Sequence, residues 1–219
     1  MNREANIRGV ILDMDGLILD TERPIVPLWI KAAKSLGWDL SLETLRRTMG
    51  VGRAVTEAVF LEEYGPGFPH EKFREILRPL VDEEFKKGIS LKPGIIVLLD
   101  HLVSCSIPYA LATSTIKEKA IWKLNKAGIL DRFSIMACGD EITSGKPAPD
   151  IFLLAAERLK LDPAFCIGFE DSAAGLQGLH AAGIRSVFIK DLFDPPPEVM
   201  TAVWRRFDDL AQAVVLFEC

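Results

Sequence analysis

The regular alternation of strand-like and helix-like segments in the second half of the chain is the feature that most constrains its fold. Short apolar runs at residues 108–113, 134–138, 165–169 and 186–189 alternate with helical patterns at residues 95–105, 116–127, 150–159 and 173–182. This order predicts βαβ units and therefore a parallel sheet. Residues 7–13 add one more buried strand, which ends in an acid shortly before Gly16. The predicted fold class is α/β, with a Rossmann-like parallel sheet in a three-layer α/β/α core.

A block of helices interrupts this core after its first strand. Helical patterns cover residues 25–36, 42–49, 53–64 and 71–87, with Pro79 expected to interrupt the last one, and no strand pattern separates them. The simplest organisation is a small helical cap domain at residues 18–90, inserted into an α/β core made of residues 1–17 and 91–219. Both ends of such an insertion must lie at the carboxyl edge of the sheet, where α/β folds bind ligands.

Composition and charge narrow the possible partners. The chain has 219 residues and a net charge of −5, which argues against nucleic acid as the main partner because phosphate backbones require a basic surface. We see no signal-type leader and no apolar span long enough to cross a membrane. We therefore expect neither nucleic acid nor a membrane as a partner. The four cysteines are Cys105, Cys138, Cys166 and Cys219. Their spacing does not match a metal site, so we expect free thiols. Free thiols in turn favour a cytoplasmic protein. The oligomeric state is not readable, and a monomer is the default.

Chemically active side chains follow several of the predicted strands. They are Asp13 and Asp15, the pair Thr113 and Ser114, Lys146, and the pair Glu170 and Asp171. Each alone has a structural explanation, because acids and threonines often cap helices and lysines are mostly solvated. Together, however, they would meet at one edge of a parallel sheet. Two carboxylates 4 Å apart repel by about 4 kcal/mol at an effective dielectric constant near 20, so such a cluster calls for a cation or raised pKa values. Oxygen ligands of this kind select a hard ion such as Mg²⁺.

Four ordered motifs match a known family. They are Asp13-Met14-Asp15-Gly16, Thr113-Ser114, Lys146 within Gly145-Lys146-Pro147-Ala148-Pro149-Asp150, and Gly168-Phe169-Glu170-Asp171-Ser172. Over nearly its whole length, the chain resembles the haloacid dehalogenase superfamily, specifically the β-phosphoglucomutase-like branch with a helical cap. The resemblance implies a magnesium-dependent phosphatase that acts on a small phosphorylated metabolite, such as a sugar phosphate, through an aspartyl-phosphate intermediate.

The resemblance also implies roles for individual residues. Asp13 would be the nucleophile, and Asp15 the general acid and then the base. Thr113 and Lys146 would hold the phosphoryl oxygens. Mg²⁺ would be bound by Asp13, the backbone carbonyl of Asp15, Glu170 and Asp171. Gly16 and Ser114 are expected to contact the substrate, as are two cap residues, Glu22 and Arg53, the latter at the place where mutases of this branch hold a second phosphate.

Three other functions stay open at this point. A sugar-phosphate mutase would share every core residue, but mutase-like members carry a histidine early in the first cap helix, and residues 21–35 contain none. A dehalogenase would need neither a metal nor the acid at position 15. A phospho-accepting signalling or scaffold protein would combine similar residues, but by family resemblance it would lack a cap-sized insertion.

Overall fold

Six parallel strands form the central sheet of this computed structural model, which describes residues 7–48 and 50–218. The strands are β1 (Gly9–Leu12), β2 (Tyr109–Thr113), β3 (Met136–Cys138), β4 (Cys166–Glu170), β5 (Arg185–Ile189) and β6 (Arg205–Phe207). Their order across the sheet is β3-β2-β1-β4-β5-β6. The chain order reverses at β1, which pairs with β2 on one side and β4 on the other. Such a reversal opens a crevice at the carboxyl ends of the strands, and this is where α/β folds bind ligands.

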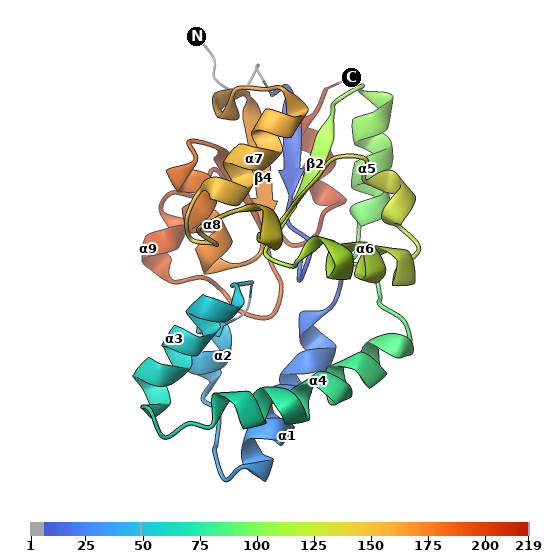
Figure 1. The fold of residues 1–219 in the computed structure, drawn as a ribbon. Coiled ribbons are helices and arrows are strands. Elements are labelled where there is room, and N and C mark those ends of the chain that lie inside the picture. Colours follow the sequence, from blue (N-terminus) through green and yellow to red (C-terminus); the bar gives the residue numbers. More distant parts are fainter. Residues whose placement is uncertain (1–6, 49, 219) are drawn as a thin grey trace.

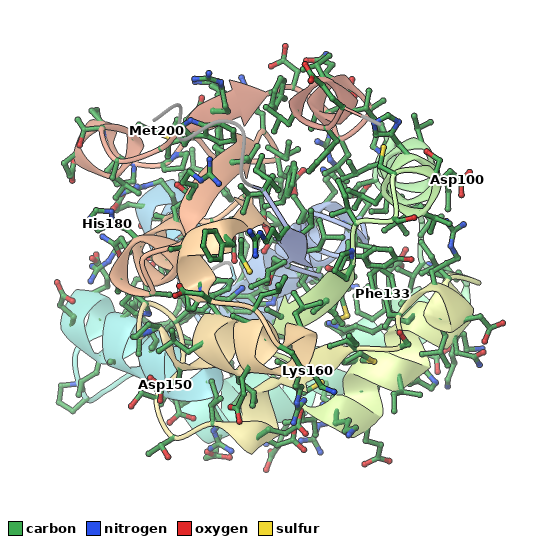
Figure 2. All side chains as sticks on the ribbon, turned by 90° about the horizontal axis from the view of Figure 1, so that it is seen from above. Asp100, Phe133, Asp150, Lys160, His180 and Met200 are labelled. Atoms are coloured by element: carbon green, nitrogen blue, oxygen red, sulfur yellow. The ribbon has the colours of Figure 1, made fainter. Side chains whose placement is uncertain are left out.

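Helices cover both faces of the sheet, so the predicted three-layer α/β class is confirmed (Figure 1). One face packs against α5 (Ile95–Ser104), α6 (Lys117–Lys126) and the 3₁₀ helix η5 (Gln212–Leu216). The other face packs against α7 (Asp150–Leu159) and α8 (Ala173–Ala181). Residues of β1 alternate between these two cores, as a strand buried on both sides must: Leu12 points to the first core and Ile11 to the second. Figure 2 shows α5 and the end of α7, marked by Asp100 and Lys160, on different sides of the strands.

A separate group of four helices lies beyond the carboxyl edge of the sheet (Figure 1). They are α1 (Glu22–Ser35), α2 (Leu42–Thr48), α3 (Arg53–Tyr64) and α4 (His70–Lys86). These helices have an aromatic core of their own, centred on Phe60, Phe68 and Phe73. Two segments connect this group to the sheet, and they run side by side, with Asp20 N donating to Ser90 O at 2.9 Å and Lys92 N donating to Ile18 O at 2.9 Å. The helical group therefore joins the core through two paired segments next to the site.

Several boundaries differ from those expected from the sequence. Helix α4 continues through Pro79, which lies on the exposed side of the helix. Proline has no backbone N–H, so one carbonyl of the preceding turn lacks its helical partner and can bind water instead. Strand β6 was not predicted, because it is a three-residue edge strand with two exposed arginines and no apolar run. A short helix, α9 (Pro197–Met200), lies between β5 and β6. The remaining short elements are the 3₁₀ helices η2 (Leu130–Arg132), η3 (Gly139–Glu141) and η4 (Pro163–Phe165).

The cysteines follow the expectation only in part. Cys138 and Cys166 are free and buried, as expected. Cys105 is disulfide-bonded, which contradicts the free thiol predicted there. Cys219 lies outside the described residues. As for membranes, a search of residues 7–48 and 50–218 finds no helix with the length and apolarity that crossing would take.

Candidate active site

Three buried carboxylates meet at the crevice beside β1. Asp13 follows β1, Glu170 is the last residue of β4, and Asp171 comes directly after it. One carboxylate oxygen from each of the three lies within 4.8 Å of the others. These residues are at most 6% exposed. The structure therefore brings together three of the four acids that the sequence predicted to converge.

Lys146 supplies the positive charge of this cluster. Its ammonium donates to Asp13 Oδ1 and, at 2.5 Å, to Glu170 Oε1. Burial by itself would lower the pKa of Lys146, but the charges of Asp13 and Glu170 outweigh it and raise that pKa above its ordinary value. Lys146 is only 1% exposed, so the prediction that it is a site residue and not a solvated surface lysine agrees with its position.

The cluster still carries excess negative charge. Burial, reinforced by the charge of Glu170 and opposed by Lys146, raises the pKa of Asp13 to about 8. Burial, followed by the charges of Glu22 and Glu170, also raises the pKa of Asp171 well above its usual range. Asp171 Oδ1 is buried and has no hydrogen-bond partner. A hard dication bound by these oxygens would satisfy the unpartnered oxygen and neutralise the charge, so the residues fit Mg²⁺.

Two glycines allow the carboxylates to pack this closely. A Cβ atom at Gly175 would meet the Glu170 carboxyl group at 1.9 Å, and one at Gly16 would meet Asp171 Oδ2 at 2.2 Å. Gly16 also has a φ of +88°, which favours glycine. Its amide donates to Leu19 O at 2.9 Å. Gly16 was predicted to bind the substrate, but in this structure its N–H is already used and it acts by making room for Asp171.

Asp15 lies apart from the other three acids and faces three donors. Lys123 Nζ and Thr21 Oγ1 donate to Oδ1 at 2.6 and 2.8 Å, and Thr115 Oγ1 donates to Oδ2 at 2.8 Å. Burial opposes ionisation of Asp15, but Lys123 and the two hydroxyls together lower its pKa. Asp15 is therefore held ionised, as a proton acceptor. Sequence reasoning missed Lys123 and Thr115, although Thr115 stands only two residues after Thr113, the last residue of β2.

The remaining core residues lie at the end of β2. Thr113 is buried, and its Oγ1 accepts a hydrogen bond from Thr115 N at 3.1 Å. Ser114 Oγ donates to Gly50 O at 3.4 Å, which connects the core to the loop after α2. Ser114 therefore faces the helical group, on the side from which a substrate would enter.

The two cap residues predicted to contact the substrate differ in their positions. Glu22 is buried, and one of its oxygens lies within 4.8 Å of oxygens of Asp171 and Asp191. Burial, together with the charges of Asp191 and Asp15, raises the pKa of Glu22 well above its usual range. Arg53 is 58% exposed and binds Glu57 at 2.5 Å and Glu71 at 2.8 Å. The structure does not bring Arg53 to the site, because the start of α3 directs it toward acids one turn along and on α4.

Asp191 is a further residue that the sequence analysis missed. It follows β5, and its Oδ1 accepts from Lys92 Nζ and, at 3.0 Å, from Arg23 Nη2. Lys92 lies on the segment that returns from the helical group to the sheet, and Arg23 lies in the first turn of α1, so Asp191 contacts both the connection and the helical group. A similar signal is present at Asp191, which stands two residues after the end of β5.

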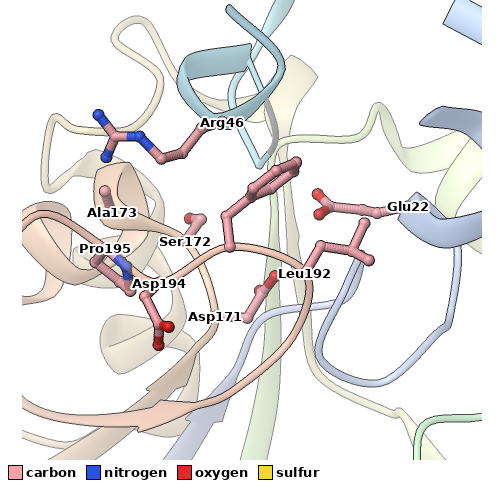
Figure 3. Close-up of a pocket in the computed structure, with 9 residues that line it drawn as sticks. Glu22, Arg46, Asp171, Ser172, Ala173, Leu192, Asp194 and Pro195 are labelled. Carbon is pink, nitrogen blue, oxygen red and sulfur yellow. The ribbon is translucent and has the colours of Figure 1, made fainter. Parts of the chain in front are cut away.

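A pocket opens from the acid cluster toward the helical group (Figure 3). Its walls come from α1, α2, the start of α8 and the loop after β5. The lining residues are Glu22, Arg46, Asp171, Ser172, Ala173, Leu192, Phe193, Asp194 and Pro195. Figure 3 shows Glu22 and Arg46 entering from the helical group, while Asp171 and Leu192 lie on the core side. Arg46, and not Arg53, is therefore the arginine of the helical group that lines this pocket.

Comparisons with known proteins identify the family of this chain. Residues 10–189 match the haloacid dehalogenase-like hydrolase family. The phosphorylated carbohydrates phosphatase of Thermotoga maritima is 31% identical over a region that covers 83% of this chain and 84% of that protein. The protein CbbY of Rhodobacter capsulatus is 33% identical over a region that covers 94% of this chain and 95% of that protein. The crystal structure of β-phosphoglucomutase from Clostridium difficile superposes with a TM-score of 0.78 at 28% identity, over 94% of this chain and 92% of that one. The prediction of a phosphoric monoester hydrolase is confirmed, and the chain belongs to the haloacid dehalogenase-like hydrolase family.

Proposed function

We propose that this protein is a magnesium-dependent phosphatase that hydrolyses a small phosphorylated metabolite, such as a sugar phosphate, through a phosphoryl group carried on Asp13. The observation that carries this proposal is the position of the Asp13 carboxylate, bound by Lys146 and within 4.8 Å of oxygens of Glu170 and Asp171. The name of the relative in Thermotoga maritima, a phosphatase of phosphorylated carbohydrates, supports the substrate class.

In the first half of the proposed reaction, an oxygen of Asp13 attacks phosphorus and the bond from phosphorus to the leaving oxygen breaks. Lys146 and Thr113 hold the phosphoryl oxygens. The departing alkoxide takes a proton from the carboxyl group of Asp15. In this structure Asp15 is ionised and accepts a hydrogen bond from Lys123, so it must release Lys123 and be protonated before this step. Asp13, the backbone carbonyl of Asp15, Glu170 and Asp171 would hold Mg²⁺, which would supply positive charge between the anionic nucleophile and the anionic phosphate.

In the second half, water attacks phosphorus and the Asp13–phosphorus bond breaks. Asp15 accepts the proton of this water and free phosphate leaves. The ionised Asp15 with its three donors is set for this step. Residues 18–90 would form the cap domain that excludes water during the first half, with the core at residues 1–17 and 91–219. A cytoplasmic location and a monomeric state stay predictions from the sequence.

The experiment that tests the proposal is an assay of phosphate release from a panel of phosphorylated sugars and other metabolites, with Mg²⁺ and with EDTA. We expect release that requires Mg²⁺ and that Asp13→Asn abolishes while the fold is retained. Release that is equal in EDTA, or that survives Asp13→Asn, would contradict the proposal.

A mutase is the second candidate, supported by the similarity to β-phosphoglucomutase. Product analysis separates the two functions, because a mutase yields a positional isomer and a phosphatase yields free phosphate. The absence of a histidine from α1 favours the phosphatase.

A further inference from the structure

A second group of three buried carboxylates lies next to the first. Glu22, Asp171 and Asp191 each have an oxygen within 4.8 Å of oxygens of the other two. These residues are at most 7% exposed. They come from three separate parts of the chain: the first turn of α1, the residue after β4 and the loop after β5. Only Asp171 belongs to both groups, so Glu22 and Asp191 have no role in the magnesium site described above.

Oxygens of this second group lack partners. Asp191 Oδ2 and Asp171 Oδ1 are buried, and no described residue donates a hydrogen bond to either of them. Asp191 Oδ1, by contrast, accepts from Lys92 and Arg23. The carboxylate of Glu22 forms no hydrogen bond or ion pair with a described residue, although Glu22 is only 5% exposed. An ionised carboxylate that is buried without a partner costs several kcal/mol, so these oxygens call for a cation.

The adjoining space suits a single ion. The pocket lined by Glu22 and Asp171 has a volume of about 20 Å³ (Figure 3). This volume holds one water molecule or one metal ion and nothing larger. A carboxylate has two oxygens, so Asp171 can bind an ion here and also Mg²⁺ in the first site. Enzymes with two metal ions hold them roughly 3.5–4 Å apart, a spacing that a shared carboxylate permits.

Charge balance indicates when such an ion binds. The two overlapping groups contain five carboxylates, those of Asp13, Glu170, Asp171, Glu22 and Asp191. They are paired with three cations, Lys146, Lys92 and Arg23. The excess of two negative charges equals the charge of one dication, so Mg²⁺ in the first site balances it. A phosphate dianion beside Asp13 adds two negative charges, and a second dication would balance these in turn.

We propose that Glu22, Asp171 and Asp191 form a second divalent-cation site, and that phosphate beside Asp13 strengthens cation binding there. All the ligands are carboxylate oxygens, which select a hard ion such as Mg²⁺ or Mn²⁺. Glu22 begins α1, while Asp171 and Asp191 belong to the core. The ion therefore ties the helical group to the core once phosphate is in place. The dependence on phosphate rests on the proposed function, whereas the ion site itself does not.

Counting bound Mn²⁺ by electron paramagnetic resonance tests the site, because Mn²⁺ prefers the same oxygen ligands as Mg²⁺. We expect wild type to bind one tight Mn²⁺ per chain without phosphate. Inorganic phosphate should tighten a second ion about tenfold or more. Glu22→Gln and Asp191→Asn should each weaken the second ion at least tenfold and leave the first unchanged. Glu62→Gln, which removes an exposed acid paired with Arg47, is the matched control and should change neither ion.

The fold of the main variant can be checked independently. Glu22→Gln removes one charge from a crowded group of acids, so its Tm in EDTA should equal or exceed that of wild type. Wild type that binds one ion with phosphate present would overturn the inference, as would Glu22→Gln that keeps the second ion at full affinity. An equal loss of the first ion in Glu22→Gln would assign Glu22 to the first site and also overturn it.

The phosphate-release assay separates this inference from the function. If wild type hydrolyses phosphate esters and still binds only one ion, the inference is wrong and the phosphatase stands. If wild type hydrolyses no ester, the proposed function is wrong, and the ion count with Glu22→Gln and Asp191→Asn still decides whether the second site exists.

Discussion

The ammonium of Lys146 is bound to the carboxylate of Asp13, which lies 133 residues earlier in the chain, and both groups are buried. Removing one partner of a buried pair leaves an uncompensated charge and is strongly destabilising. We therefore expect Lys146→Met to lower the free energy of unfolding by about 3 kcal/mol or more and kcat by about 10²–10³-fold. Chemical denaturation and initial rates measure the two effects. Lys86→Met, which removes an exposed pair with Glu83, is the control and should change little. A Lys146→Met variant as stable as wild type would contradict the importance of this contact.

The raised pKa of Asp13 predicts how stability depends on pH without metal. In the unfolded chain Asp13 has its ordinary pKa of 3.8, and in the fold burial raises that pKa to about 8. Between these values the folded state binds more protons, so its stability falls as pH rises. We expect the Tm in EDTA to fall between pH 5 and pH 8.5, and the stabilisation by Mg²⁺ to grow over the same range.

Thermal unfolding of wild type and Asp13→Asn, with EDTA and with Mg²⁺, measures this dependence. Asp13→Asn should flatten the fall in Tm, because asparagine does not titrate. An equally steep fall in both proteins would assign the dependence to other groups, such as Asp171, whose pKa is also raised.

Lys123 is predicted to set the pH dependence of the step in which Asp15 acts as a base. Because Lys123 lowers the pKa of Asp15, Lys123→Met should raise it and move the acidic limb of the dephosphorylation rate to higher pH. Rapid-quench measurement of phosphate release over a range of pH checks this shift. Lys126→Met, on the same helix and next to Trp122, is the control. An unshifted limb with a uniformly lower rate would mean that Lys123 acts only on structure.

Asp191 and Lys92 form a second buried pair, and a double variant tests it without leaving a lone charge. Asp191→Leu alone should cost about 3–5 kcal/mol of unfolding free energy, because Lys92 stays buried without this partner. Lys92→Met combined with Asp191→Leu should recover most of that loss. Denaturant unfolding of the single and double variants measures the coupling. Additive losses would show that the two side chains do not depend on each other.

The core of the site could be predicted because parallel strands bring their carboxyl ends to one edge. Asp13 and Glu170 are far apart in sequence, yet each stands at the end of a strand, and the alternating pattern alone predicts that they meet. The same rule applied to the strand at residues 186–189 would have identified Asp191.

The parts of the site that could not be predicted depend on how helices are oriented. Arg46 lies on α2 and Arg53 is the first residue of α3, and the sequence does not say which of them faces the core. The structure directs Arg53 to Glu57 and Glu71 and places Arg46 in the pocket. Likewise, the sequence around Lys123 is typical of a solvated helix residue. Only the packing of α6 next to Asp15 brings its ammonium to that carboxylate. Tertiary packing determines these contacts, and local sequence patterns do not predict it.

The central claim is that Asp13 carries the phosphoryl group, and detection of that group tests it most directly. The enzyme would be mixed with substrate and Mg²⁺, quenched in acid within the first turnover, digested and examined by mass spectrometry. We predict a phosphoryl group on the peptide that contains Asp13, absent in Asp13→Asn, where steady-state phosphate release is also lost. A phosphoryl group on another residue, or undiminished turnover in Asp13→Asn, would contradict the account.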